Sequence, residues 1–573
     1  AQAKRRTQAV IIDHLVPPLT RAENYGPLRD LERLADEYYD AMDMDPARAR
    51  FLRSDILQLL QQNHLDKELA IEASADDDTL LRQVDAYLCE LKESQIRDGL
   101  HIFAVSPVGD QRIDTLLALV RMPRADGRNE NASLLRALAR AFEMNFDPLD
   151  CDMASTWTGP CPPVLYDICP DAWRTHADTR ERLELFARAL IAHWLEQPLT
   201  SLVRFGGNAQ YWPLVENILD HLKSNIAPTF DACGTLEING LMAALAGRFV
   251  PAGPSGAPSR GRPDVLPTGR NFYSVDTRSV PTPTAWRIGS QAAFALLERH
   301  LQDHGDYPRT IGLSVWGTAT MRTGGDDIAQ ALALLGVRPT WAPGSLRVVD
   351  FEIVPLDALD RPRIDVTLRV SGFFRDAFPG LIRLFDAAVH AVAALDESDA
   401  DNPIRARIRE EQSRLQLAGS SEENARRQAG WRVFGSKPGA YGAGLQGPID
   451  ERCWQNRADL ADAYLNWGGY AYGSHDEGTP ARERFVERLG SLDAVVHNQD
   501  NREHDILDSD DYYQFLGGMV AAVEVVSGRA VAAYHGDTSQ AGLPRIRTLK
   551  EELNRVIRSR AVNPKWINGV KRH

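Results

Sequence analysis

The feature that most constrains the fold is an alternation, from Arg309 onward, of short apolar runs with helical segments. The runs TIGLSVWG, RVVDFEIVP and IDVTLRVSG are rich in β-branched residues, and helical patterns occupy 327–335 and 381–395. LDAVVHNQD and AVAAYHG continue the alternation around a helical pattern over 510–526. Strands that alternate with helices form mostly parallel sheets, with ligand loops where the strands end. We therefore expect α/β architecture in this half.

The preceding half is different, because its apolar residues recur every three or four positions from Leu28 to about Leu245. A chain of 573 residues also exceeds one hydrophobic core. We predict a multidomain, mixed α/β protein: a helix-rich N-terminal half followed by α/β units with short, mostly parallel sheets. The expected divisions are a mainly helical region (1–250), a Pro/Gly/Arg-rich ligand loop or linker (251–290), an α/β unit (291–417) and a second α/β unit with an acidic, His-containing motif (418–573).

Composition restricts the partners. Sixty-five Lys and Arg against 79 Asp and Glu give a net charge of −14, which disfavours nucleic acid. No apolar stretch approaches the ~20 residues that span a bilayer, and AQAKRRTQAV lacks an apolar signal core. The six cysteines contain no Cys-x-x-Cys pair. We expect a cytoplasmic protein with reduced thiols and no membrane or nucleic-acid partner.

The Pro/Gly-rich stretch before the α/β half contains Arg262 and Arg270 close to Phe272 and Tyr273. Arginine and aromatic side chains on an irregular segment suit a flat anionic ligand. A structureless linker is the alternative, although loops this long are uncommon in compact proteins. Both interpretations stay open at this point.

Two further candidate loops follow predicted strands. Thr318 and Arg322 lie in WGTATMRTGGDD, where a carboxylate-bearing ligand at a helix N-terminus is one interpretation. Helix capping by Asp326 or Asp327 is the other.

Arg375, in SGFFRDAF, is predicted either to bind a ligand or to pair with Asp376. Tyr441 lies in SKPGAYGAG, a glycine-rich loop that can approach a ligand closely. The formal dinucleotide fingerprint over 442–447 lacks a preceding strand and a following helix, so we do not interpret it as a nucleotide site.

The most concentrated signal runs from His497 to Tyr513, with five aspartates, one glutamate and two histidines in 17 residues. Crowded carboxylates raise one another's pKa unless a cation or an arginine relieves them. Oxygen and imidazole ligands suit Co²⁺, Ni²⁺ or Zn²⁺, and a partly protonated carboxylate can transfer protons. A solvated acidic loop with helix caps at Asp508 to Asp510 is the alternative.

Long strings resemble the large subunits of aerobic cobaltochelatases, in the CobN/magnesium chelatase H-subunit superfamily. They include LPTGRNFYSVD, GTATMRTGGDDIAQALALLGVRP, RPRIDVTLRVSGFFRDAFPGLI, FGSKPGAYGAGL, NQDNREHDILDSDDYYQFLGGM and NPKWINGVKRH. The first string and EHDILDSDDYYQF look like the cobalt branch of the family.

The resemblance implies a large subunit that binds hydrogenobyrinic acid a,c-diamide and Co²⁺ for cobalt insertion in cobalamin biosynthesis. ATP and Mg²⁺ would bind a separate AAA+ ATPase subunit, assisted by a von Willebrand-type adaptor, in agreement with the missing P-loop sequence. The implied site residues are metal ligands (Asp500, Glu503, His504, Asp508), proton-transfer groups (Glu503, His504, Asp508) and corrinoid-binding residues (Arg262, Arg270, Thr318, Arg322, Arg375, Tyr441).

The family's large subunits also carry an upstream His-Phe-Gly-x-His-Gly-x-x-Glu-Trp-Leu-Pro-Gly stretch and continue beyond the position of His573. We therefore expect a fragment, or one half of a split subunit, that is inactive alone. The competing functions are a non-catalytic corrinoid or tetrapyrrole carrier and the porphyrin-binding subunit of a magnesium chelatase.

Overall fold

The computed structural model describes residues 9–42, 44–69, 77–197, 202, 205–273, 275–540 and 542–573. The chain divides into two compact units. Unit 1 comprises Ala1–Ala9, Tyr273–Asn501 and Asp505–Glu552, and unit 2 comprises Val10–Phe272, Arg502–His504 and Leu553–His573. The mixed α/β fold expected from the sequence is confirmed, and each unit is described separately below.

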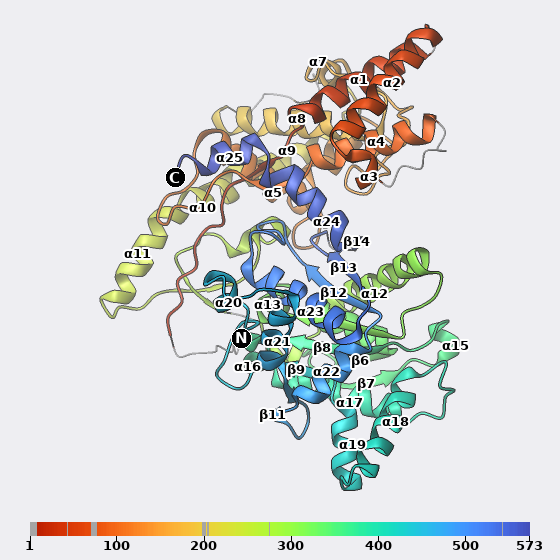
Figure 1. Ribbon diagram of the computed structural model, residues 1–573. Helices are drawn as coiled ribbons and strands as arrows, with labels where there is room; N and C mark the ends of the chain where they lie inside the picture. Colours follow the sequence, from red (N-terminus) through yellow and green to blue (C-terminus); the bar gives the residue numbers. More distant parts are fainter. Residues whose placement is uncertain are drawn as a thin grey trace. The chain divides into compact units, whose positions relative to one another are not determined.

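Unit 1 is built on one eight-stranded sheet with the order β11-β10-β9-β8-β5-β12-β13-β14 (Figure 1). Its five inner strands, β9, β8, β5, β12 and β13, are parallel, and the outer strands are antiparallel. The bounds are β5 (Thr310–Val315), β8 (Asp365–Val370), β9 (Val433–Gly435), β10 (Tyr470–Tyr472), β11 (Glu477–Pro480), β12 (Ala494–Gln499), β13 (Ala532–Asp537) and β14 (Arg545–Thr548). Both α/β stretches expected from the sequence contribute strands to this sheet.

Helices cover both faces of the sheet. One face packs against α14 (Asp326–Leu335), and α12 (Pro283–His304) and α17 (Pro379–Ala393) pack against α14. The other face packs against α21 (Arg457–Gly468) and α23 (Asp510–Ser527), and α22 (Arg482–Gly490) packs against both of these helices. The apolar runs that predicted β5, β8 and β12 are fully buried because helices lie on both sides. The run RVVDFEIVP is different, because its strand β7 (Val348–Ile353) pairs only with β6 (Val337–Trp341).

Unit 2 is mainly helical. One core joins α1 (Pro27–Met42), α2 (Pro46–Gln62) and α4 (Asp77–Lys92). A second core joins α5 (Gly109–Arg121), α6 (Leu134–Ala141), α8 (His176–Glu196) and α9 (Trp212–His221). The final helix α25 (Pro564–Val570) returns to the start of the unit, where Lys565 Nζ donates to Thr20 Oγ1 at 2.8 Å (Figure 1).

The Pro/Gly-rich segment is ordered where it is described. It forms two short strands, β3 (Ala252–Pro254) and β4 (Asn271–Tyr273), which pair with each other, and two 3₁₀ turns between them. Ile12 also bridges to Asn271. The described part of this segment is therefore not structureless, and its role as a ligand loop or a linker stays a prediction. Across the described residues, no helix combines the length and apolarity needed to cross a membrane.

Candidate functional site

The direction in which strands are added to the sheet of unit 1 changes between β5 and β12. Open α/β sheets bind ligands at such a change of direction. The chain fills the sheet outward in two directions from β5, to β8 and β9 on one side and to β12 and β13 on the other. Loops that leave neighbouring strands in opposite directions diverge, so ligands of open α/β sheets bind at the carboxyl ends of such strands. Two of the loops named from the sequence, those after β5 and β12, begin at this point.

The loop after β5 turns directly into a short helix, α13 (Gly317–Thr323). A Cβ at Gly317 would lie 2.7 Å from the backbone nitrogen of Phe374, so the chain after β5 packs closely against the chain after β8. α13 carries Thr318, which is exposed, and Arg322, which is half-buried. Both residues therefore lie in the short helix that directly follows the carboxyl end of β5.

The prediction that Asp326 or Asp327 caps the next helix, α14, is wrong. Gly325 occupies the N-cap position of α14 with φ +104°, and the Thr323 hydroxyl accepts hydrogen bonds from Gly325 N and Asp326 N, both at 3.0 Å. Asp327 instead accepts from Asn498 Nδ2 at 2.9 Å, which ties α14 to β12. The tertiary contact with β12 thus determines the use of Asp327.

Arg322 and Asp500 form the central ion pair of this edge. Arg322 donates through Nε to Asp500 Oδ2 at 2.9 Å and through Nη2 to Oδ1 at 2.8 Å, a bidentate arrangement. The Asp500 side chain is only 4% exposed and also accepts from Asn501 Nδ2 at 3.1 Å. From the sequence, Arg322 is expected to bind an anionic ligand and Asp500 to bind a metal ion. The structure makes each the partner of the other, and we call them the strand-end pair.

A row of buried polar side chains lies one or two residues before the ends of these strands. Arg369 on β8 is the register partner of Ser314 on β5, and His497 on β12 is the register partner of His535 on β13. All four side chains are fully buried. Val496 pairs with Leu313, which places His497 level with Ser314. Only the polar positions inside otherwise apolar strand runs could have revealed this row from the sequence.

Aromatic rings adjoin the row. The ring centroid of Tyr512 lies 4.5 Å from that of His497 and 5.3 Å from that of Trp316. Burial raises the pKa of Tyr512, and the negative charge of Asp500 raises it further. Tyr512 therefore stays protonated at neutral pH, and its hydroxyl oxygen accepts a hydrogen bond from Arg322 of the strand-end pair.

Arg375 and Tyr441 are brought together, but by structural contacts. Arg375 Nε donates to Asp376 Oδ1 at 2.7 Å, and Tyr441 Oη donates to Asp376 Oδ2 at 2.7 Å. Arg375 Nη1 also donates to backbone oxygens of Ser436, Lys437 and Ala440. Arg375 thus pairs with Asp376, and its guanidinium holds the glycine-rich loop in place, while ligand binding by Arg375 stays a prediction.

The remaining predicted residues divide between the units. In unit 2, Arg262 pairs with Asp264 at 2.7 Å, and Arg270 donates to Val265 O at 2.6 Å. Glu503 accepts from Ser259 Oγ at 2.9 Å, and His504 is half-buried.

Asp508 belongs to unit 1, where its Oδ1 accepts from Asp505 N at 3.1 Å. Asp500 also belongs to unit 1, whereas Glu503 and His504 cluster with unit 2. The four-residue metal set therefore stays a prediction.

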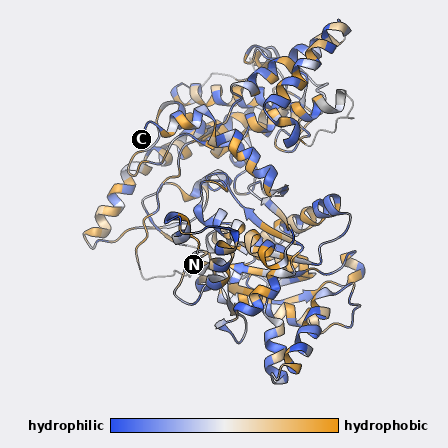
Figure 2. Cartoon of the chain, in the orientation of Figure 1, coloured by the Kyte–Doolittle hydropathy of each residue, from blue (hydrophilic) through white to orange (hydrophobic). Residues whose placement is uncertain are grey.

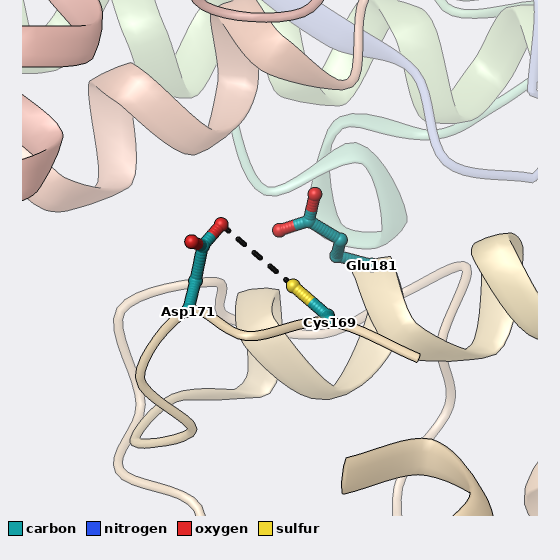
Figure 3. A group of neighbouring side chains, drawn as sticks. All are labelled: Cys169, Asp171 and Glu181. Carbon is teal, nitrogen blue, oxygen red and sulfur yellow. Dashed lines mark hydrogen bonds between the residues drawn. The ribbon is translucent and has the colours of Figure 1, made fainter. Parts of the chain in front are cut away.

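A different group has metal-like composition in unit 2. Among the residues that the structure describes, Cys169, Asp171 and Glu181 are the one set of three such side chains whose ligand atoms lie within 4.8 Å of one another (Figure 3). We call it the thiol–carboxylate group. Lys92 Nζ lies 2.8 Å from Glu181 Oε2, and Arg21 Nη2 lies 2.9 Å from Glu181 Oε1. Sequence spacing missed this group because Glu181 comes from α8.

Protein cations and a neutral thiol already satisfy that group. Burial raises the pKa of the Cys169 thiol, so the sulfur does not offer the thiolate that metals bind. Lys92 also approaches Asp171 Oδ2, at 3.7 Å. We interpret the thiol–carboxylate group as part of an ion-pair network.

Comparison with known proteins agrees with this architecture. The family model described as CobN/Magnesium Chelatase matches residues 1–573. The aerobic cobaltochelatase subunit CobN of Pseudomonas aeruginosa is 67% identical over 575 residues, which cover 100% of this chain and 45% of that protein. CobN of a Sinorhizobium species is 55% identical over 590 residues, again covering 100% of this chain and 45% of the relative.

A solved structure, the catalytic subunit of cobaltochelatase from Mycobacterium tuberculosis, superposes with a TM-score of 0.86 at 42% identity. The match covers 98% of this chain and 45% of that one. The chain therefore spans a little under half the length of these relatives. Because the family model and both sequence relatives match essentially the whole chain, this protein belongs to the CobN/magnesium chelatase family.

Proposed function

We propose that the chain is part of the large subunit of an aerobic cobaltochelatase. In this role it binds hydrogenobyrinic acid a,c-diamide and Co²⁺ for the ATP-driven insertion of cobalt during cobalamin biosynthesis. The observation that carries the proposal is the strand-end pair. It puts an anion-binding guanidinium and a cation-binding carboxylate in one ion pair, at the edge where α/β sheets bind ligands.

The pair implies that the two substrates bind in a coupled way. Arg322 cannot grip a corrinoid carboxylate with both nitrogens while it holds Asp500 by the same two nitrogens. A corrinoid carboxylate that takes Arg322 removes a bidentate guanidinium, and its positive charge, from the buried Asp500. Carboxylate oxygen is a suitable ligand for Co²⁺, which restores the balance. Corrinoid binding should therefore strengthen Co²⁺ binding.

Insertion replaces two ring N–H protons by Co²⁺ and strips water from the ion. Asp500 is the proposed first ligand, and Glu503, His504 and Asp508 are the proposed additional ligands and proton acceptors. Thr318 is exposed beside Arg322 and can donate its hydroxyl to the same corrinoid carboxylate. Arg262 and Arg270 are proposed for the other carboxylates of the macrocycle, and Arg375 and Tyr441 for shaping the loop that lies against it.

The energy source is proposed to lie outside this chain. An AAA+ ATPase subunit would bind ATP and Mg²⁺, and a von Willebrand-type adaptor would transmit its conformational change. The sequence, which contains no Gly-x-x-x-x-Gly-Lys-Ser/Thr, supports this division of labour. The complex is proposed to be cytoplasmic.

The coupling is tested by titrating Co²⁺ into the chain with and without the corrinoid, followed by calorimetry. We expect affinity to rise about tenfold with corrinoid, equivalent to about 1.4 kcal/mol. Asp500→Asn should abolish the increase, whereas Asp510→Asn, at an exposed position in the same acidic segment, should retain it. Equal Co²⁺ affinity in both conditions for the unmodified chain would contradict the role of the strand-end pair.

Turnover is tested in the full-length subunit with its ATPase partners. A cobalt-dependent change of the corrinoid absorption spectrum is expected only when ATP is present. Corrinoid binding without that change would indicate a carrier. A preference for porphyrin and Mg²⁺ would indicate a magnesium chelatase subunit.

A further inference from the structure

Helix α11 (Cys233–Leu245) in unit 2 exposes an unusually apolar surface. Figure 2 shows the helix coloured mainly as hydrophobic along its length. Leu236 and Ile238 are 37% and 39% exposed, and Met242 is 53% exposed. Leu245 and Phe249, at and beyond the end of the helix, reach 74% and 85%. We call these five side chains the α11 surface.

The one charged residue of α11 faces away from this surface. Glu237 is fully buried and accepts hydrogen bonds from Leu15 N at 2.7 Å, Thr268 Oγ1 at 2.7 Å and Ala104 N at 2.9 Å. Although burial opposes ionisation, these donors together with His101 lower the pKa of Glu237, so the carboxylate is charged and anchors the helix. The exposed side of α11 is thus left without any charge of its own.

The anchoring contacts lie between Gly234 and Gly240. Gly234 N donates to Ser106 Oγ at 2.9 Å. At Gly240, a Cβ would meet the carbonyl oxygen of Gly269 at 2.2 Å, so backbone approaches backbone there. The helix is therefore held rigidly at its start, while Met242 and Leu245 are presented to solvent.

The loop that packs against the start of α11 also exposes apolar residues. Ser106 also donates to Asp231 O at 3.0 Å, which seats the loop beside the start of α11. In this loop Ile102, Phe103 and Val105 are 48%, 40% and 52% exposed. Scattered exposed apolar residues are ordinary, but many exposed apolar residues on one helix and on the loop seated beside it, with few charges among them, mark an interface.

We infer that the α11 surface is the docking site for polypeptide that the CobN relatives carry beyond the region matched by this chain. Those relatives and the solved neighbour contain more chain outside the match than within it, since the match covers 45% of each. Interfaces between permanently associated parts of one protein are apolar at their centre and poor in charge. The α11 surface has this character. The occupant is therefore an apolar segment of the same large subunit.

The inference is tested by site-resolved thiol labelling, read by mass spectrometry so that the native exposed Cys161 and Cys453 are distinguished. Leu245→Cys is made in this chain and at the aligned position of full-length Pseudomonas aeruginosa CobN. Phe51→Cys is the matched control, because Phe51 is a 68% exposed apolar residue on another helix of unit 2.

We expect labelling at the position of Leu245 to be at least about tenfold slower in the full-length protein than in this chain, with the Phe51 position unchanged. Equal rates at the Leu245 position in the two proteins would overturn the inference. Slow labelling in this chain alone would also overturn it. A dependence of that slow rate on protein concentration would then identify a second copy as the occupant, and independence would identify another part of the same chain.

A second pair of variants separates docking from folding. Met242→Asp and Leu245→Asp should leave the unfolding midpoint of this chain unchanged, because both side chains are exposed in it. The same changes in the full-length protein should increase its susceptibility to limited proteolysis. An unchanged cleavage pattern in the full-length variants would contradict the proposed interface.

Discussion

The strand-end pair and the thiol–carboxylate group have similar chemistry but different surroundings. Each contains buried carboxylate oxygens held by protein cations. Asp500 is held by the guanidinium of Arg322 and lies where the loops of a parallel sheet diverge. Glu181 has two cationic partners and lies on a long helix inside an ion-pair network. The difference teaches that the neighbours and the topological position, rather than acidic residues alone, indicate a site that can exchange its partner for a ligand.

The largest expected effect concerns the network. Glu181→Gln leaves the buried ammonium of Lys92 and the guanidinium of Arg21 with less negative charge nearby. Removing one partner of a buried ion pair costs about 3 kcal/mol, because the remaining charge is uncompensated. Urea unfolding of unit 2, followed by tryptophan fluorescence, measures the loss.

Asp171→Asn is the control for that variant. The Asp171 side chain is 52% exposed and lies 3.7 Å from Lys92 Nζ, so its removal should cost no more than about 0.5 kcal/mol. A larger loss for Asp171→Asn than for Glu181→Gln would reverse the assignment of the group as an ion-pair network centred on Glu181.

The sequence predicts the strands that carry the strand-end pair, but it does not predict that Arg322 and Asp500 contact each other. The apolar runs identify β5, β8 and β12 because buried parallel strands are apolar on both faces. The chain directions place Arg322 and Asp500 at strand ends. Their contact joins residues 178 positions apart, and one sequence contains no information on such pairing.

Other features lay beyond sequence reasoning for similar physical reasons. Strand β7 is apolar enough to resemble the sheet strands in sequence, but it pairs with β6, and Val349, Asp350 and Glu352 are exposed. The order within the Pro/Gly-rich segment depends on two contacts. Ile12 bridges to Asn271 of β4, and Arg270 donates to Val265 O. The thiol–carboxylate group likewise needs a helix to bring Glu181 to Cys169.

The strand-end pair should show a smaller stability effect, with strong dependence on its partner. Arg322→Met leaves Asp500 buried without its bidentate donor, which we expect to cost about 2 kcal/mol. The double variant Arg322→Met with Asp500→Asn should recover about 1 kcal/mol of this loss, because the buried negative charge that lost its bidentate donor is also removed. Chemical unfolding of the four proteins gives the coupling energy. Strict additivity would mean that the two side chains do not interact in solution.

The smallest expected effect is the pH dependence of the thiol–carboxylate group. Although burial opposes ionisation of Glu181, Arg21 and Lys92 lower its pKa below the ordinary value. A carboxylate with a lowered folded-state pKa adds stability above its unfolded pKa of about 4.3, and that contribution is lost as pH falls through the folded value. The advantage of the unmodified chain over Glu181→Gln should therefore be constant from pH 7 to 5 and shrink by about 1 kcal/mol towards pH 3.

The comparison with Glu181→Gln is needed because a neighbour titrates in the opposite sense. Burial raises the pKa of Glu93 to about 7, so its protonation stabilises the fold as pH falls below that value. Both proteins retain Glu93, and the difference between their unfolding free energies cancels its contribution. A difference that grows between pH 5 and pH 3 would show that Glu181 is not the charged partner of Lys92 and Arg21. The thiol–carboxylate group would then be free of its cations and comparable with the strand-end pair as a place for a metal ion.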